Sequence, residues 1–197
     1  MSELDEDAEL DGELRQRLRW RPAVKSRAFF GRRAGWYAIV RALRPRRVVE
    51  TGTHNGLGST ALLAALDRNA FGELVSIDPR LGAGWLVPHR LRARWRPVRA
   101  TSFATLGSTG PIDLFIHDSL HTPECERWEL ETAASLGANV LLSDNAHAAD
   151  TCSAFASSRN GTFSIWNERV SGHFYPGGAI GIVQLEGENS DPGGTSA

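Results

Sequence analysis

Short apolar segments alternate with helix-forming segments along most of this chain, and this alternation is the feature that most constrains its fold. The predicted strands are apolar over almost their whole length and cover residues 47–50, 74–78, 96–100, 112–117 and 139–143. The predicted helices between them cover residues 59–67, 88–95, 102–106 and 123–136. Strands that alternate with helices form βαβ units with right-handed crossovers, and near-continuous apolar strands are typical of a parallel sheet covered on both faces.

The two ends of the folded region differ from this pattern. Residues 162–167 and 179–185 read as strands joined by a turn-rich segment, which predicts an antiparallel hairpin at the sheet edge. Residues 14–18 and 35–43 predict helices that cap the domain. The expected fold is therefore α/β: a Rossmann-like, doubly wound sheet of seven strands, mostly parallel, with a C-terminal antiparallel hairpin and an N-terminal helical cap.

Length and composition predict one domain over residues 13–186. Residues 1–12 are acidic and residues 187–197 are rich in small polar residues, so both are expected to be disordered tails. A net charge of −1 and the lack of a long apolar run favour neither nucleic acid nor a membrane as partner. Cys125 and Cys152 lack CxxC spacing. They favour a reduced, cytoplasmic protein over a disulfide framework or a zinc site.

A glycine-rich turn, Glu-Thr-Gly-Thr-His-Asn-Gly-Leu-Gly-Ser at residues 50–59, follows the first predicted strand. Glycine lets the backbone approach a ligand closely, and the helix that begins here favours a negative group at its N-terminus. The G-x-x-x-G-x-G spacing differs from the dinucleotide fingerprint. Asp78 ends the second predicted strand, 20 residues after Gly58. From there its carboxylate can accept hydrogen bonds from both hydroxyls of a ribose.

Polar residues also follow the fourth and fifth predicted strands. The fourth ends in His-Asp at residues 117–118, and the fifth ends in Ser-Asp-Asn at residues 143–145. Neighbouring parallel strands lie about 4.8 Å apart and end at the same edge, so oxygen atoms of Asp118, Asp144 and Asn145 can converge there. Three oxygen ligands without a thiolate suit a hard divalent cation such as Mg²⁺ or Mn²⁺.

With these motifs the chain resembles the class I S-adenosylmethionine (SAM)-dependent methyltransferases. That family has an acidic residue before a glycine pattern of this kind and an acid at the end of the second strand, and the resemblance covers roughly residues 36–186. It implies SAM as cofactor, with the glycines along the methionine moiety, Asp78 at the ribose and residues 101–102 near the adenine. The cofactor-binding residues that it implies are Glu50, Thr51, Gly52, Thr53, Asn55, Gly56, Gly58, Ser59, Asp78, Thr101, Ser102 and Asp118.

Within that class, the chain looks similar to the catechol and caffeoyl-CoA O-methyltransferases. There, an Asp after the fourth strand and an Asp-Asn pair after the fifth bind the metal, and a lysine three residues after the first Asp is the general base. The resemblance implies Asp118, Asp144 and Asn145 as metal ligands. His121 stands at the lysine's place, as in related bacterial macrolide sugar O-methyltransferases. This departure puts the phenolic substrate class in doubt more than the metal.

The predicted function is metal-assisted O-methylation of a hydroxyl on a sugar or small natural product, with His121 as general base and Asp118 also catalytic. The alternatives are a metal-independent O- or N-methyltransferase and a catalytically silent SAM-binding domain. No large lid domain is inserted, which suggests an open cleft or a lid from a second subunit in a homodimer. Acceptor contacts are expected from aromatic residues and one histidine near the cap and the hairpin: Phe29, Phe30, Trp36, Tyr37, Trp166, His173, Phe174 and Tyr175.

Overall fold

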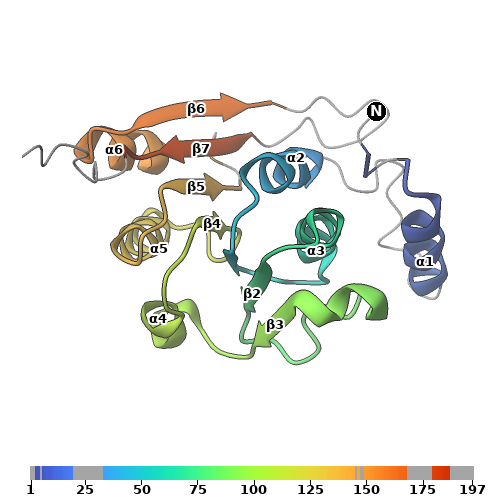
Figure 1. Ribbon diagram of the computed structural model, residues 1–197. Coiled ribbons are helices and arrows are strands. Elements are labelled where there is room, and N and C mark those ends of the chain that lie inside the picture. The colour runs from blue at the N-terminus through green and yellow to red at the C-terminus, as the bar shows by residue number, and fades with distance from the viewer. Residues whose placement is uncertain are drawn as a thin grey trace, which may run out of the picture.

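The structure is a computed structural model that describes residues 3–4, 6–19, 33–144, 146, 149–167 and 179–186 (Figure 1). The strands in this part of the chain are β1 (Arg47–Thr51), β2 (Glu73–Ile77), β3 (Trp95–Val98), β4 (Leu114–His117), β5 (Val140–Ser143), β6 (Thr162–Trp166) and β7 (Ile180–Gln184). The α-helices are α1 (Ala8–Leu18), α2 (Arg33–Leu43), α3 (Leu57–Asn69), α4 (Ser102–Thr105), α5 (Pro123–Ser135) and α6 (Thr151–Ser158). The described residues also form the 3₁₀ helices η2 (His89–Arg94) and η3 (Leu106–Ser108).

The strands form one sheet in the order β3-β2-β1-β4-β5-β7-β6. The first five are parallel, whereas β7 runs antiparallel to both β5 and β6. The chain builds outward from β1 in one direction and from β4 in the other, so the strand order reverses between these two central strands. Ligands of open α/β sheets bind outside the carboxyl ends of the strands at such a reversal. The prediction of a mostly parallel, seven-stranded, doubly wound sheet with a C-terminal antiparallel hairpin is confirmed.

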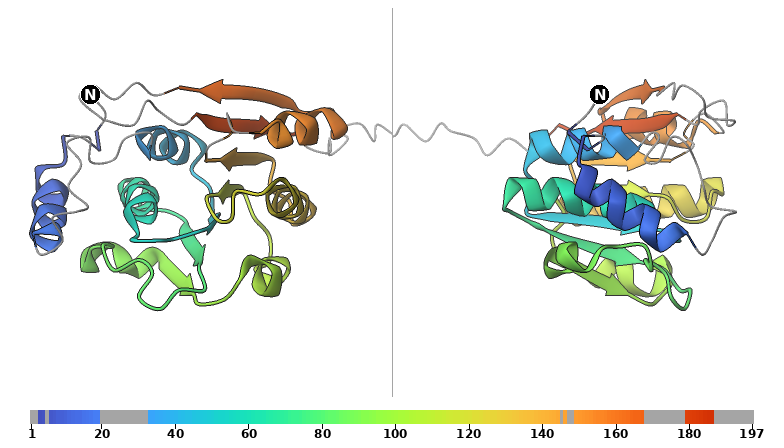
Figure 2. Two further views of the ribbon diagram at one scale, coloured as in Figure 1. Left: turned by 180° about the vertical axis from the view of Figure 1, so that it is seen from behind. Right: turned by 90° about the vertical axis from the view of Figure 1, so that its right-hand side faces the viewer.

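Consecutive strand residues face opposite sides of the sheet, and this gives the protein two apolar cores. On β1, Val48 packs with the helices α1, α2 and α3, whereas Val49 packs with α5 and α6. Figures 1 and 2 show these helices on opposite faces of the sheet. Because both faces are covered, the central strands need apolar residues at nearly every position, and this explains the lack of alternation in their sequences.

The structure differs from the expected disordered tail at residues 8–12, which form the beginning of a helix. Helix α1 begins at Ala8, and the side chain of Asp7 accepts a hydrogen bond of 2.9 Å from the backbone N–H of Leu10. Leu10 is fully buried together with Leu14, one helical turn further on. Leu10 and Leu14 are spaced to lie on one face of a helix, but the acidic residues around Leu10 led to the prediction of a tail. The expected tail at residues 187–197 lies outside the described residues.

Helix α6 was not predicted from the sequence, although its pattern contains a weak signal. Cys152, Phe155 and Ala156 are buried, and their spacing of three and four residues places them on one face of the helix. The helix is only 8 residues long, and polar residues make up much of the rest of it. In the described part of the chain, no helix has the length and apolar character needed to cross a bilayer.

Candidate active site

Four parallel strands end side by side, and each is followed directly by a residue that the sequence marked as functional. Gly52, Asp78, Asp118 and Asp144 come after β1, β2, β4 and β5, in that order. Backbone hydrogen bonds extend the sheet ladder by one residue at each of them; for example, the N–H of Asp118 donates to Thr51 and the N–H of Asp144 donates to His117, both at 2.9 Å. The sheet itself therefore fixes the spacing of these residues.

The glycine turn brings the backbone of β1 against that of β4. Gly52 has a φ of +89°, and a Cβ at this position would lie 1.8 Å from the backbone oxygen of Asp118. Only glycine adopts this backbone conformation so close to another chain segment without strain. Gly56 has a φ of +91° and leads into α3. The turn thus places the N-terminus of α3 at the same edge as the strand-end acids.

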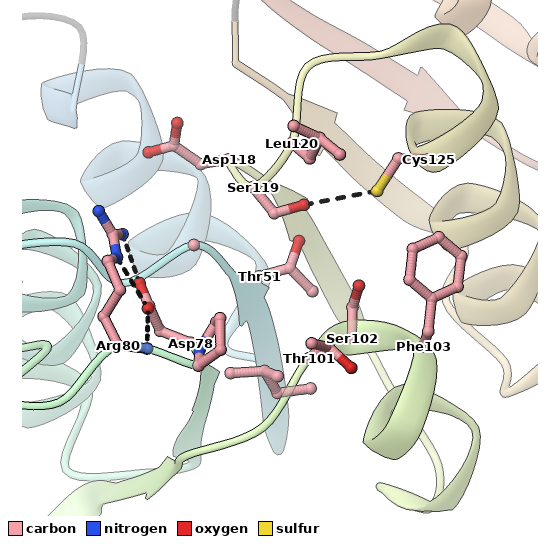
Figure 3. Close-up of a pocket in the computed structure, with 13 residues that line it drawn as sticks. Thr51, Asp78, Arg80, Thr101, Ser102, Phe103, Asp118, Ser119, Leu120 and Cys125 are labelled. Carbon is pink, nitrogen blue, oxygen red and sulfur yellow. Dashed lines mark hydrogen bonds and ion pairs between the residues drawn. The ribbon is translucent and has the colours of Figure 1, made fainter.

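A cavity of about 390 Å³ opens at this edge of the sheet (Figure 3). Six of the residues that line it were predicted to bind the cofactor: Thr51, Gly52, Asp78, Thr101, Ser102 and Asp118. The other lining residues were not predicted as cofactor contacts: Ile77, Pro79, Arg80, Phe103, Ser119, Leu120 and Cys125. The cavity therefore runs from the end of β2, past the glycine turn, to the end of β4.

The remaining predicted cofactor residues shape the turn and do not line this cavity. Buried Glu50 accepts hydrogen bonds from Ser59 and, at 2.6 Å, from Ser76, and burial raises its pKa to about 7. The side-chain oxygen of Asn55 accepts a hydrogen bond from the N–H of Leu57. Gly56 and Gly58 belong to the entry into α3, and Thr53 lines a smaller neighbouring cavity of about 110 Å³. Contact of these residues with a cofactor stays a prediction.

Asp118, His121 and Asp144 form a cluster at the ends of β4 and β5. One candidate ligand atom from each residue lies within 4.8 Å of the other two, and Nε2 of His121 is 3.7 Å from Oδ1 of Asp118. Burial and the adjacent Asp144 raise the pKa of Asp118 well above its usual range, against the opposing charge of Arg33. Two neighbouring carboxyl groups repel each other when both are ionised, and a bound cation relieves this repulsion. The cluster thus suits a cation.

The structure brings together three of the four residues predicted for the metal and the chemistry. Asn145 lies outside the described residues, so its role as a ligand stays a prediction. His121 was predicted as a base, yet its position also allows it to be a ligand beside Asp118 and Asp144. The two roles exclude each other at Nε2, because a nitrogen that binds a metal has no free lone pair to accept a proton.

A buried carboxylate that was not predicted from the sequence is hydrogen-bonded to residues at the ends of β1 and β4, beside this site. Glu129 on α5 accepts hydrogen bonds from Thr51 at 2.5 Å and Ser119 at 2.8 Å, and its Oε2 lies 2.6 Å from Nδ1 of His117. Burial opposes ionisation of Glu129, but the bonds from His117 and other donors outweigh it and lower its pKa. Glu129 therefore joins the ends of β1 and β4 to α5 as an ionised acceptor, with Nδ1 of His117 donating.

Two of the aromatic residues predicted to contact the acceptor are core residues. Trp36 and Tyr37 are 1% and 3% exposed, and the hydroxyl of Tyr37 donates to Glu3 at 2.8 Å. Trp166, at the end of β6, is exposed. The other predicted contacts lie outside the described residues: Phe29, Phe30, His173, Phe174 and Tyr175.

The fold and the strand-end site agree with the comparisons to known proteins. A family model described as a methyltransferase domain matches residues 49–158, which is more than half of the chain. The chain therefore belongs to this methyltransferase family, and its fold is that of the class I SAM-dependent methyltransferases. Among curated proteins, none matches the chain at a significant level.

Solved structures of methyltransferases share the fold at low sequence identity. The O-methyltransferase TomG from Streptomyces achromogenes, involved in tomaymycin synthesis and in complex with SAM, is 18% identical with a TM-score of 0.65, covering 92% of this chain and 91% of that one. An O-methyltransferase from Bacillus cereus in complex with SAH (S-adenosylhomocysteine) is 14% identical with a TM-score of 0.66, covering 91% of each chain. A methyltransferase from Geobacter sulfurreducens is 18% identical with a TM-score of 0.64, covering 90% and 89%.

Arg80 donates hydrogen bonds to the carboxylate of Asp78, which is predicted to hold the cofactor ribose. Oδ1 of Asp78 accepts hydrogen bonds of 2.9 Å from the backbone N–H and from Nε of Arg80. Oδ2 accepts a bond of 2.5 Å from Nη2 of Arg80 (Figure 3). It also accepts one of 2.8 Å from the N–H of His54. A carboxylate has about four acceptor sites, so Asp78 is saturated. Ribose hydroxyls can bond to it only if the Arg80 side chain moves away.

Removing the Arg80 guanidinium is therefore expected to tighten cofactor binding. In Arg80→Met, SAH should bind about two- to fivefold more tightly, because it no longer competes with a partly exposed ion pair. Isothermal titration calorimetry measures this, with Arg96→Met on the exposed face of β3 as the control that should not change the affinity. Weaker binding in Arg80→Met would contradict the competition and make Arg80 a direct cofactor contact.

Proposed function

We propose that this methyltransferase uses SAM to methylate a hydroxyl group on a sugar or other small natural product, assisted by a divalent cation at Asp118 and Asp144. The cation would be Mg²⁺ or Mn²⁺, with Asn145 as a further ligand. A single observation supports the proposed metal site: candidate ligand atoms of Asp118, Asp144 and His121 lie within 4.8 Å of one another beside the cavity. Two O-methyltransferases among the structural neighbours support oxygen as the acceptor atom.

The chemistry of these residues fits the proposed reaction. A hydroxyl is a weak nucleophile at neutral pH, and a divalent cation bound to it lowers its pKa and orients it. An imidazole titrates near neutral pH, so His121, which is exposed at the mouth of the cluster, can accept the hydroxyl proton at Nε2. Asp78 would hold the ribose, and the side chains of Thr101 and Ser102 would lie along the adenine. Because SAM carries an activated methyl group, positioning supplies much of the remaining catalysis.

The metal is tested by titrating the protein with Mn²⁺ in the presence of SAH, followed by electron paramagnetic resonance. The native protein is expected to have one tight site, and Asp144→Ala should weaken it by at least about 100-fold because it removes a direct ligand. Asp150→Ala is the matched control, since Asp150 is exposed and lies on the same connection between β5 and α6. A native protein without any Mn²⁺ site would refute the metal and favour a metal-independent reaction at oxygen or nitrogen.

The same titration separates the two roles of His121. If His121 is the base, His121→Ala should leave the Mn²⁺ affinity unchanged while transfer of a labelled methyl group falls by about 10²- to 10⁴-fold. If His121 is a ligand, the Mn²⁺ affinity itself should fall. A native protein that binds SAH and Mn²⁺ but methylates no hydroxyl compound in a broad acceptor panel would favour the catalytically silent alternative.

A further inference from the structure

Arg33, the first residue of α2, has a guanidinium group that the described residues pair only in part. Its Nε atom is buried and has no hydrogen-bond partner among them. The guanidinium lies over the ring of Trp36, with its carbon 5.7 Å from the ring centroid, and Nη2 is 4.0 Å from Oδ2 of Asp118. A buried donor without an acceptor is costly, and a charged one more so, which points to a ligand that completes its bonding.

The position of Arg33 relates it to the glycine turn. A Cβ at Gly58 would lie 3.5 Å from Nε of Arg33 and 2.7 Å from the ring of Trp36. Gly58 is the second residue of α3, and its backbone N–H lies in the first turn, where the helix itself supplies no acceptor. A guanidinium and a helix N-terminus therefore adjoin each other, and both favour a negatively charged group. The charge of Arg33 also reaches the site, because Nη2 of Arg33 forms an ion pair of 4.0 Å with Asp118.

The charges along the cavity indicate which part of a SAM molecule would bind beside Arg33 and the N-terminus of α3. SAM has a positive sulfonium, a positive ammonium and one negative group, the carboxylate of its methionine moiety. The acids at the strand ends, Asp78 and Asp118, suit the neutral ribose hydroxyls and the positive groups. Of the two arginines beside these acids, Arg80 lies at Asp78, the acid proposed for the ribose, whereas Arg33 lies beside Gly58 and has a buried Nε without a partner. The carboxylate therefore has one suitable cationic partner among the described residues of the site.

We infer that Arg33 binds the methionine carboxylate of SAM and makes the protein specific for a cofactor that carries this group. The inference rests on the proposed SAM dependence and extends it to a residue before the glycine motif. A guanidinium presents two parallel N–H groups that match the two oxygens of a carboxylate, whereas lysine offers a single point charge. Arg33 is therefore a specificity-determining residue for the cofactor.

The experiment compares two ligands that differ only in the carboxylate: SAH and its decarboxylated form, S-adenosyl-3-thiopropylamine. Titration calorimetry is carried out on the native protein, Arg33→Met and Arg33→Lys, with Arg46→Met as control. Arg46 is exposed at the opposite end of β1. Arg33→Met is expected to weaken SAH binding by about 10- to 100-fold and to change the affinity for the decarboxylated ligand less than about threefold. Arg33→Lys should lie between the native protein and Arg33→Met for SAH alone.

The outcomes separate this inference from the proposed function. An equal loss of affinity for both ligands in Arg33→Met and Arg33→Lys would refute carboxylate recognition, because a general disturbance of the site does not depend on the carboxylate. Unchanged SAH affinity in both variants would refute it as well. In either case the native protein still binds SAH and the proposed function stands. A native protein that binds neither ligand would overturn the proposed use of SAM together with the inference.

Discussion

A Gly52→Ala variant is expected to lose at least about 100-fold in affinity for SAH. The added Cβ would lie 1.8 Å from the backbone oxygen of Asp118 and 2.4 Å from its carbonyl carbon, and both belong to the backbone rather than to a flexible side chain. The φ of +89° adds strain for any residue with a Cβ. Relief of this overlap requires the ends of β1 and β4 to move apart, and these ends form the floor of the cavity. Displacement of binding groups by about 1 Å is costly on this scale.

Titration calorimetry with SAH measures the effect, and thermal unfolding shows whether the variant is folded. Gly107→Ala is a suitable control, because a Cβ at Gly107 meets nothing within 4 Å. That variant should bind SAH like the native protein. Native affinity in Gly52→Ala would mean that the contact between β1 and β4 relaxes without changing the site, and the role assigned to the close backbone approach would be wrong.

A Glu129→Ala variant is expected to lose about 3–5 kcal/mol of unfolding free energy, because the buried Glu129 carboxylate is hydrogen-bonded to several side chains at once. His117 and Glu129 are both fully buried, and Thr51 and Ser119 donate to the same carboxylate. Truncation leaves these donors without their acceptor, and each orphaned group costs about 1–3 kcal/mol if no water replaces it. The loss is large because one side chain connects β1, β4 and α5.

Urea unfolding gives the change in free energy from the shift in midpoint at constant m-value. Glu129→Gln keeps the shape and one acceptor oxygen, so its loss should be smaller than that of Glu129→Ala. Glu131→Ala is the matched control on the same helix, since Glu131 is exposed, and its effect should stay within about 0.5 kcal/mol. A loss below about 1 kcal/mol in Glu129→Ala would show that solvent replaces the missing acceptor and that the network is not structural.

Much of the fold followed from local patterns in the sequence. The strands around Val48–Val49 and Leu114–Ile116 are apolar on both faces, and this property reports directly on a parallel sheet covered by helices. The C-terminal hairpin was likewise predicted from the turn-rich segment between its two strands. The start of α1 and the whole of α6 were missed, because their buried residues, such as Leu10 and Phe155, are few and lie among polar neighbours. Their helical state depends on packing more than on propensity.

The sequence by itself determined which residues stand at the ends of the central strands. Gly52, Asp78, Asp118 and Asp144 each follow an apolar strand, and in a parallel sheet such ends meet at one edge whatever the rest of the chain does. The tertiary structure alone decided what surrounds them. Arg33 lies beside Asp118, and Glu129 lies beneath Thr51, although both pairs are far apart in the sequence. The reason is physical: a strand end is marked by a local change from apolar to polar residues, whereas an ion pair or a buried hydrogen bond depends on packing between distant elements and leaves no local pattern.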